Sequence, residues 1–263
     1  MPLLPLRTIN VTRYLTPLRE GGSLPAIVEG DDDFLYVLKF RGAGQGVKAL
    51  IAEQVGGELA RALGLKVPEL VFALVDPAFG RTEPDEEIQD LLKASAGLNL
   101  GLHYLSGAIT YDPAVSAVDG SLASRIVWLD ALLMNVDRTA RNTNMLMWQK
   151  ELWLIDHGAS LYFHHAGSDF SGQAQRPFTM IKDHVLLRWA DRLEEADADG
   201  RAALTPALVC ALTDALPADW LETAFPGEDP EAMRKAYCDY LNERIADTAP
   251  FLKEALHARD AAL

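Results

Sequence analysis

The stretch that decides the fold reads Asn135-Val136-Asp137-Arg138-Thr139-Ala140-Arg141-Asn142-Thr143-Asn144. It follows an apolar stripe at helical spacing, residues 122–133, and precedes a short apolar segment, residues 145–148. Asp137 and Asn142 carry carboxylate and amide oxygens, which are hard ligands of the kind that Mg²⁺ accepts. Taken alone, however, an Asp and an Asn after a helix are equally typical of an ordinary turn, because both residues favour turns.

A second polar turn follows at Leu154-Ile155-Asp156-His157-Gly158. An acid at the end of an apolar strand, with Gly two positions later, is a recurrent way to hold a metal ion. Phosphoryl transfer from a nucleotide needs a carboxylate near the attacking hydroxyl and oxygen ligands for Mg²⁺. Asp137 and Asn142 stand five positions apart, as the catalytic Asp and the metal-binding Asn do in kinase catalytic loops. We therefore predict Asp137 as the catalytic carboxylate, with Asn142 and Asp156 as metal ligands.

Upstream, a lysine and a glutamate complete the predicted site. Lys39 lies at the end of a predicted strand, residues 34–40, and Glu53 follows fourteen residues later on a predicted helix, residues 47–64. A strand Lys paired with a helix Glu is how kinases hold the α- and β-phosphates. Glu58, on the same helix, is the alternative partner for Lys39.

A glycine-containing turn precedes these elements. It reads Glu20-Gly21-Gly22-Ser23-Leu24-Pro25 and lies between the first predicted strands. Its glycines and serine leave backbone N–H groups and a hydroxyl to meet phosphate. We therefore predict that Gly22 and Ser23 bind the nucleotide.

The chain resembles the HipA-like kinase family, which shares its catalytic architecture with phosphatidylinositol kinases and protein kinases. The resemblance rests on five stretches between residues 12 and 165: Gly21–Ser23, Val37–Phe40, Glu53–Pro68, Asn135–Asn144 and Leu154–Gly158. It implies ATP and Mg²⁺ as cofactors, and transfer to a Ser or Thr hydroxyl of a protein. By position it implies a catalytic Asp137, metal binding by Asn142 and Asp156, and phosphate binding by Lys39.

The order of the predicted elements indicates an α+β, bilobal kinase-like fold. Strands dominate the first part, which also contains the helix at residues 47–64, and helices dominate after residue 121. We predict a nucleotide-binding lobe at residues 1–105 and a helical catalytic lobe at residues 106–263, with the ligand in the cleft between them. The other predicted elements are strands at residues 8–15, 26–28, 70–75, 145–148 and 151–155, a strand and an interlobe connection within residues 97–111, a helix or surface insertion at residues 82–94, and helices at residues 178–192, 203–215 and 230–257.

Composition narrows the class of protein further. Lys and Arg number 24 and Asp and Glu number 38, which gives a net charge of −14 and argues against direct nucleic-acid binding. The chain contains no apolar run of the roughly 18 to 20 residues that a membrane span needs, and its first residues make a poor signal peptide. Cys210 and Cys238 make no disulfide framework, so we expect a reducing, cytoplasmic location.

Several other polar groups receive structural interpretations. His164-His165 is read as a solvated loop beside the cleft, because adjacent residues do not face one ligand. Asp197-Ala198-Asp199-Gly200 is read as a helix-ending acidic loop, since it lacks the final Glu of a calcium site. Residues 42–46 do not meet the dinucleotide fingerprint and are read as a flexible connection. Arg138 or Arg141 is a candidate for offsetting transition-state charge.

The sequence therefore predicts an ATP- and Mg²⁺-dependent kinase with a nucleotide and a protein substrate as partners and no membrane association. A kinase for a small-molecule hydroxyl is an open variant. A non-catalytic nucleotide-binding module and a purely structural scaffold are the alternatives. The set of Lys39, Asp137, Asn142 and Asp156 argues against the non-catalytic module, because decayed kinases usually lose one of these groups.

Overall fold

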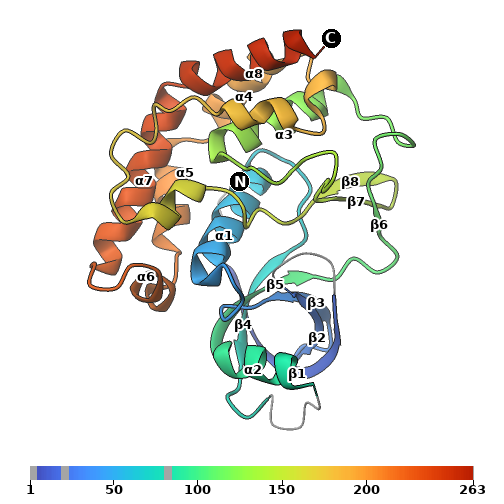
Figure 1. Cartoon of the computed structure of the whole chain (residues 1–263), viewed down its shortest axis with the longest axis vertical. Helices are drawn as coiled ribbons and strands as arrows, with labels where there is room; N and C mark the ends of the chain where they lie inside the picture. The colour runs from blue at the N-terminus through green and yellow to red at the C-terminus, as the bar shows by residue number, and fades with distance from the viewer. Residues whose placement is uncertain (1–4, 19–23, 80–84, 263) are drawn as a thin grey trace.

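In the computed structural model, which describes residues 5–18, 24–79 and 85–262, the N-terminal part forms a closed five-stranded β-barrel (Figure 1). Its strand order is β1-β2-β3-β5-β4, and β1 closes the ring by pairing in parallel with β4. The strands are β1 (Thr8–Pro17), β2 (Ala26–Gly30), β3 (Leu35–Lys39), β4 (Leu70–Val75) and β5 (Gly97–His103). These strands confirm the β-rich start that the sequence predicts.

The alternation of side chains along β3 explains which of them fill the barrel and why Lys39 points away from it. Along β3, Tyr36 and Leu38 are fully buried in the barrel, while Leu35, Val37 and Lys39 are only half-buried. Because successive side chains point to opposite faces of a strand, Lys39 projects away from the barrel core. α2 (Glu86–Ala94) packs against this core through Leu92, Ile88 and Leu91.

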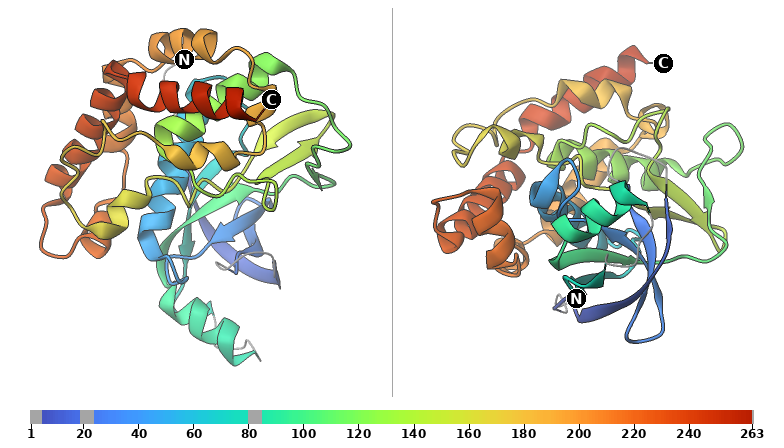
Figure 2. Two further views of the ribbon diagram at one scale, coloured as in Figure 1. Left: turned by 45° about the horizontal axis from the view of Figure 1, so that its top comes forward. Right: turned by 60° about the horizontal axis from the view of Figure 1, so that its bottom comes forward.

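α1 (Gly46–Ala62) lies between the barrel and the helices, as the two further views also show (Figure 2). It contacts β5 on one side and α3, α5 and α6 on the other. Its residues from 50 to 60 are all buried. A helix buried on every side must carry small residues where a neighbour approaches closely, and Gly57 lies where a Cβ would approach Leu70 Cδ1 to 2.7 Å.

The second part of the chain is helical apart from one small sheet. The small sheet contains β6 (Ile109–Thr110), β7 (Met145–Trp148) and β8 (Glu151–Leu154), in that order. The α-helices are α3 (Gly120–Leu133), α4 (Leu193–Ala203), α5 (Pro206–Asp214), α6 (Ala218–Ala224), α7 (Pro230–Ala246) and α8 (Ala249–Ala261). Three 3-10 helices precede α4: η2 (Tyr162–Ala166), η3 (Thr179–Asp183) and η4 (Leu187–Trp189).

Together the elements form an α+β, bilobal kinase-like fold, as predicted. We call the barrel with α1 and α2 the barrel lobe, and α3 to α8 with the small sheet the helical lobe. α3 is central to the helical lobe and packs against α1, α4 and α8. The boundary that we placed between residues 105 and 106 stays a prediction.

Three predicted elements of the helical lobe are wrong. Residues 178–192 form two 3-10 helices rather than one α-helix, because His184 is extended and forms a β-bridge with Thr139. The predicted acidic loop around Asp197 lies inside α4. The predicted helix at residues 230–257 is two helices, and Pro250 in the first turn of α8 explains the break, since proline cannot continue a helix.

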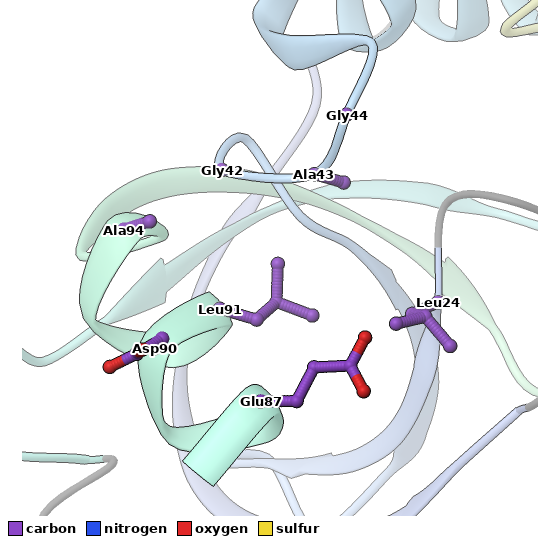
Figure 3. Close-up of a pocket in the computed structure, with 8 residues that line it drawn as sticks. All are labelled: Leu24, Gly42, Ala43, Gly44, Glu87, Asp90, Leu91 and Ala94. Atoms are coloured by element: carbon purple, nitrogen blue, oxygen red, sulfur yellow. The ribbon is translucent and has the colours of Figure 1, made fainter.

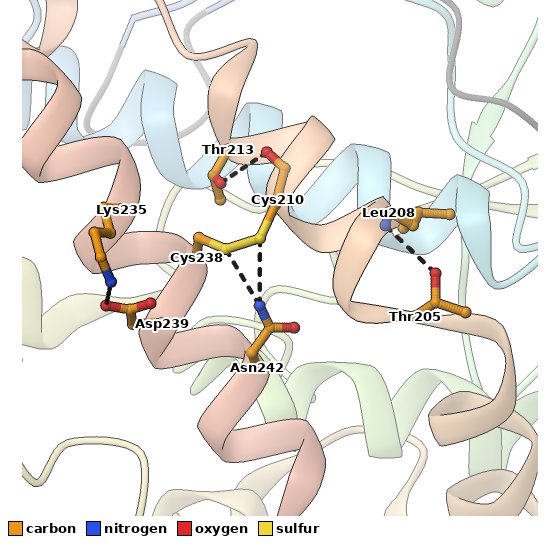
Figure 4. Close-up of a disulfide and its surroundings, with 8 residues drawn as sticks. All are labelled: Thr205, Leu208, Cys210, Thr213, Lys235, Cys238, Asp239 and Asn242. Carbon is orange, nitrogen blue, oxygen red and sulfur yellow. Dashed lines mark hydrogen bonds and ion pairs between the residues drawn. A yellow bond between two sulfur atoms is a disulfide. The ribbon is translucent and has the colours of Figure 1, made fainter.

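The sequence analysis, which found no disulfide framework, did not foresee a bond between the two cysteines. Cys210 on α5 and Cys238 on α7 form a disulfide, and Asn242 Nδ2 lies 3.2 Å from Cys238 Sγ (Figure 4). The bond joins two helices that already pack side by side. Among the described residues, no helix has both the length and the apolar character that a membrane span requires.

Candidate active site

The predicted site residues converge on one cavity of about 160 Å³ between the two lobes. Lys39 enters it from the end of β3, and Glu53 enters from α1. The loop after α3 contributes Asp137 and Asn142, and the turn after β8 contributes Asp156. Five residues that span more than a hundred positions of sequence therefore line the same space. Gly22 and Ser23 lie outside the described residues.

The ammonium of Lys39 lies between two carboxylates. Its Nζ donates to Asp156 Oδ1 at 2.7 Å and lies 4.0 Å from Glu53 Oε2. The Lys39 side chain is only 12% exposed. Burial by itself would lower the pKa of Lys39, but Glu53 and Asp156 outweigh burial and raise that pKa above its ordinary value. The lysine is therefore a fixed positive charge in the cavity.

Glu53 is the partner of Lys39, and the alternative, Glu58, is not. Glu58 forms an ion pair with Arg61 on its own helix. The Glu53 carboxylate is buried, and His157 Nδ1 lies 3.7 Å from its Oε1. Burial favours the neutral acid, but the charge of Lys39 opposes it and lowers the pKa of Glu53. Glu53 is therefore ionised beside the lysine at neutral pH.

His157 reaches Glu53 because α1 has no side chain at the crossing point. A Cβ on Gly56 would lie 2.6 Å from His157 Cβ, which is closer than real Cβ atoms approach. Gly56 thus lets the turn after β8 lie directly on α1. His157 is fully buried at this contact between the turn and α1.

The Asp137 carboxylate is oriented by two amides. Asn142 Nδ2 and Asn144 Nδ2 donate to its Oδ2 at 2.8 and 3.1 Å, and the Asp137 backbone N–H donates to Asn135 Oδ1 at 3.1 Å. Because Asn142 Nδ2 is used in this way, its Oδ1 is the atom that can meet a cation. Asn135 and Asn144, which the sequence analysis did not assign, hold the loop in shape.

A buried network beneath the loop was not foreseen. Asp130 is fully buried on α3, where Arg138 Nε donates to its Oδ2 at 2.5 Å. His184 Nδ1 accepts the N–H of Leu186, so the proton lies on its Nε2, which is 2.9 Å from Asp130 Oδ2. Burial would raise the pKa of Asp130, but Arg138 and His184 outweigh it and lower that pKa.

Arg138 also joins the two halves of the site. Its Nη1 donates to the carbonyls of Asn144 and, at 3.4 Å, Ile155. Ile155 precedes Asp156, whose φ of +57° places it in the left-handed region. Arg138 is 1% exposed. Its side chain is therefore part of the support beneath the loop. Arg141, the other candidate for offsetting transition-state charge, is exposed on the same loop, and that role stays a prediction.

The prediction of a solvated loop at His164-His165 is wrong for His164, whereas His165 is exposed. His164 lies in η2, is fully buried, and its Nδ1 is 2.9 Å from the hydroxyl of Tyr237. Burial, and then the positive charges of His165 and Lys48, lower its pKa well below the ordinary value. Lys48 Nζ donates to the His164 carbonyl at 2.7 Å, so this segment is tied to α1.

A larger hollow of about 410 Å³ opens between the loop after β3 and α2 (Figure 3). Glu87 and Leu91 of α2 point into it in this view. It shares Ala43 with the smaller cavity, but none of the predicted catalytic or metal-binding residues lines it. The predicted site residues of the described part of the chain therefore lie at the smaller cavity.

The donor set of the smaller cavity fits Mg²⁺. Asp137, Asp156 and Asn142 offer carboxylate and amide oxygens, which this ion prefers, and kinase sites complete its shell with phosphates and water. No cluster of three His, Cys, Asp or Glu residues suited to a metal occurs in the described part of the chain. A soft or all-protein metal cage therefore finds no support in the described residues.

A barrel lobe with a Lys–Glu pair, facing an Asp–Asn loop of a helical lobe, defines a protein of the kinase class. The family model for the HipA-like kinase matches residues 11–244, and the chain belongs to this family. The resemblance found in the sequence is thereby confirmed.

A solved structure supports the same fold. The chain is similar to the Helicobacter pylori proinflammatory kinase CtkA, with a TM-score of 0.58 and 13% identity over 98% of this chain and 99% of that one. The Golgi casein kinase with Mn/ADP bound is more distant, with a TM-score of 0.46 and 14% identity over 99% of this chain and 75% of that one. A search of curated protein sequences found no match.

Proposed function

We propose that this kinase transfers the γ-phosphoryl group of ATP, in the presence of Mg²⁺, to a Ser or Thr hydroxyl of a protein. The single observation that carries the proposal is the convergence of Lys39, Glu53, Asp137, Asn142 and Asp156 on one cavity. In kinases, catalysis is almost entirely positioning and electrostatic stabilisation, and each of these charges has a defined place in it.

Each residue has one role in the proposal. Asp137 orients the acceptor hydroxyl and takes its proton while the new O–P bond forms and ADP leaves. Lys39, held by Glu53, neutralises charge on the α- and β-phosphates. Asn142 Oδ1 and the Asp156 carboxylate hold Mg²⁺, which supplies charge neutralisation at the β- and γ-phosphates. Gly22 and Ser23 stay predicted phosphate contacts.

The test uses Asp137→Asn, which keeps the shape of the side chain and removes its basicity. We expect the rate of ADP formation from ATP and MgCl₂ to fall by roughly 10²- to 10⁴-fold, the usual contribution of a general base. Nucleotide binding, measured as the shift of Tm caused by ATP and MgCl₂, should be retained. Equal turnover by the variant and the wild type would contradict the assignment of Asp137 as the general base.

The acceptor class is tested separately. The protein is incubated with ATP and MgCl₂ alongside a cell lysate from which nucleotides have been removed, and phosphorylated residues are identified by mass spectrometry. The proposal expects phosphoserine or phosphothreonine that is absent with Asp137→Asn. Turnover that is stimulated only by the small-molecule fraction of the lysate would instead favour a small-molecule hydroxyl as acceptor.

A cytoplasmic location is part of the same proposal, and the Cys210–Cys238 bond is the observation against it, because disulfides persist mainly in oxidising compartments. Alkylation of free thiols in intact cells, before lysis, distinguishes the two. Cytoplasmic protein should carry two alkylated cysteines, whereas protein in an oxidising compartment should carry none.

A further inference from the structure

α6 belongs to the helical lobe, yet its side chains bind the barrel lobe. The guanidinium of Arg41, which follows β3, pairs with Asp219 and donates from Nη2 to Thr223 Oγ1 at 3.1 Å. Trp220, which is fully buried, donates its indole N–H to the Leu98 carbonyl on β5 at 2.9 Å. We call this set of contacts the α6 clamp.

The clamp lies beside both members of the Lys–Glu pair. Arg41 is two residues after Lys39, so an anchored Arg41 fixes the end of the strand that carries the lysine. α6 also packs along α1, which carries Glu53. Next to Glu53, the buried Gln54 Nε2 donates to the carbonyl of Ala215, the C-cap of α5, at 3.2 Å, and we include this contact in the α6 clamp.

The ring of Trp220 extends the same attachment into the barrel wall. It meets Phe72 of β4 edge to face, with the ring centroids 5.7 Å apart. The indole therefore joins β4, β5 and α6 at one point. A fully buried Trp with its N–H satisfied is a strong anchor, because it combines a large apolar area with a directed hydrogen bond.

We propose that the α6 clamp is a positioning element that holds Lys39 and Glu53 together, so that α1 is fixed in its catalytic position by the chain's own C-terminal helices. This inference rests on the proposed function. In regulated protein kinases the corresponding ion pair is made and broken by movement of its helix. Here, Trp220 and Gln54 tie the strands and the helix to the helical lobe.

The geometry of the Lys39–Glu53 pair explains why a small movement of α1 would lower the rate. Lys39 Nζ is already 4.0 Å from Glu53 Oε2 but only 2.7 Å from Asp156 Oδ1. If α1 moves away, the lysine stays with Asp156 and no longer faces the α- and β-phosphates. A displacement of about 1 Å in a positioning group can cost roughly 10²-fold in rate.

The test uses three conservative variants that spare the cavity. Trp220→Phe keeps an aromatic ring near Phe72 but removes the N–H and part of the buried ring volume, Gln54→Leu removes the link to α5, and Asp219→Asn removes the charge paired with Arg41. Glu222→Gln, on the exposed face of the same helix, is the matched control. ADP formation without added acceptor gives kcat and KM for ATP, and hydrogen exchange reports on α1.

We expect Trp220→Phe and Gln54→Leu each to lower kcat roughly tenfold while KM for ATP changes less than threefold. The amides of α1 should exchange faster in both variants, and Asp219→Asn should show the same pattern more weakly. Glu222→Gln should match the wild type. Denaturant midpoints confirm that all variants are folded at the assay temperature.

Two results would overturn the inference. Variants with kcat within twofold of the wild type show that the clamp does not position the pair, whether or not α1 exchanges faster. A fall in activity that only follows the unfolded fraction shows a structural role alone. If the wild type itself forms no ADP from ATP and MgCl₂, the proposed function fails first, and the positioning role fails with it.

Discussion

At the scale of single residues, Arg138 shows how one buried side chain holds the loop that carries Asp137 in shape. It pairs with Asp130 below and binds the carbonyls of Asn144 and Ile155 above. A guanidinium can make these contacts together because its donors form a rigid fork, which an ammonium cannot replace.

We expect Arg138→Lys to lower the free energy of unfolding by about 1–3 kcal/mol, because an ammonium keeps the charge near Asp130 but cannot also make the guanidinium's hydrogen bonds to the buried carbonyls. Turnover should fall as well. Urea unfolding followed by circular dichroism measures the first effect. Arg141→Lys, on the same loop but exposed, is the stability control and should stay within about 0.5 kcal/mol of the wild type.

His164 predicts a pH dependence of stability. The pKa of His164 is lowered in the folded protein, so at mildly acidic pH the unfolded chain binds a proton at this residue and the folded protein does not. Proton binding therefore lowers the free energy of unfolding. The loss is negligible well above the ordinary pKa of 6.5 and grows as the pH falls below that value. At pH 5.5 it amounts to roughly 1.4 kcal/mol.

We therefore expect the wild type to lose stability between pH 7.5 and 5.5, and His164→Gln to lose less, as measured by urea unfolding at both values. His165 contributes in the same direction because burial also lowers its pKa. The lowered pKa values of Glu53 and Asp130 act only at more acidic pH. An equal loss in His164→Gln would contradict the assignment.

The individual site residues were predictable because their chemistry leaves few alternatives. Lys39, Glu53, Asp137, Asn142 and Asp156 were all named from residue type and order, and all line the cavity. Their roles stay predictions. Asp130 and His184 were not foreseen, because a buried Asp within an apolar helix and a histidine 54 positions away carry no joint signal in one sequence.

At the scale of elements, α1 depends on Gly56 for its contact with the turn after β8. We expect Gly56→Ala to destabilise the protein by about 1–3 kcal/mol, because its Cβ would overlap His157 and force the turn away from Glu53. Turnover should fall with it.

Gly44→Ala is the matched control, since no other atom lies within 4 Å of its Cβ position. Thermal unfolding of both variants checks the prediction. A Tm for Gly56→Ala equal to that of Gly44→Ala would show that α1 accommodates the extra methyl group.

Elements were predicted well where local periodicity decides them and poorly where tertiary contacts do. The barrel strands and α1 follow the apolar pattern. The acidic sequence at residues 197–200 is helical because Trp128 Nε1 donates to Asp197 Oδ1 at 2.8 Å and Gly200 makes room for the indole ring. Residues 178–192 are not one helix, because Val185 N–H donates to the Arg138 carbonyl. No local sequence pattern predicts such tertiary contacts.

At the scale of the whole molecule, the disulfide stabilises the helical lobe by limiting the unfolded chain. Its cysteines are 28 positions apart, and a loop of this length contributes about 3–4 kcal/mol in the chain-entropy model. We expect Cys210→Ser with Cys238→Ser to lower the free energy of unfolding by about this amount.

Tm with and without dithiothreitol measures the effect. The wild type should lose stability on reduction, and the double variant should not respond. Two reactive thiols in the purified, denatured wild type, titrated without reductant, would show that the bond does not form in solution.

The closed barrel has a consequence for recruitment and aggregation. Each of the five barrel strands has a neighbour on either side along part of its length. Few main-chain N–H and C=O groups are therefore free to pair with a strand of another polypeptide and extend the sheet. The outer strands of the small sheet, β6 and β8, are where such extension can occur. Ile109 on β6 is 66% exposed, so self-association through strand addition should begin in the helical lobe rather than in the barrel.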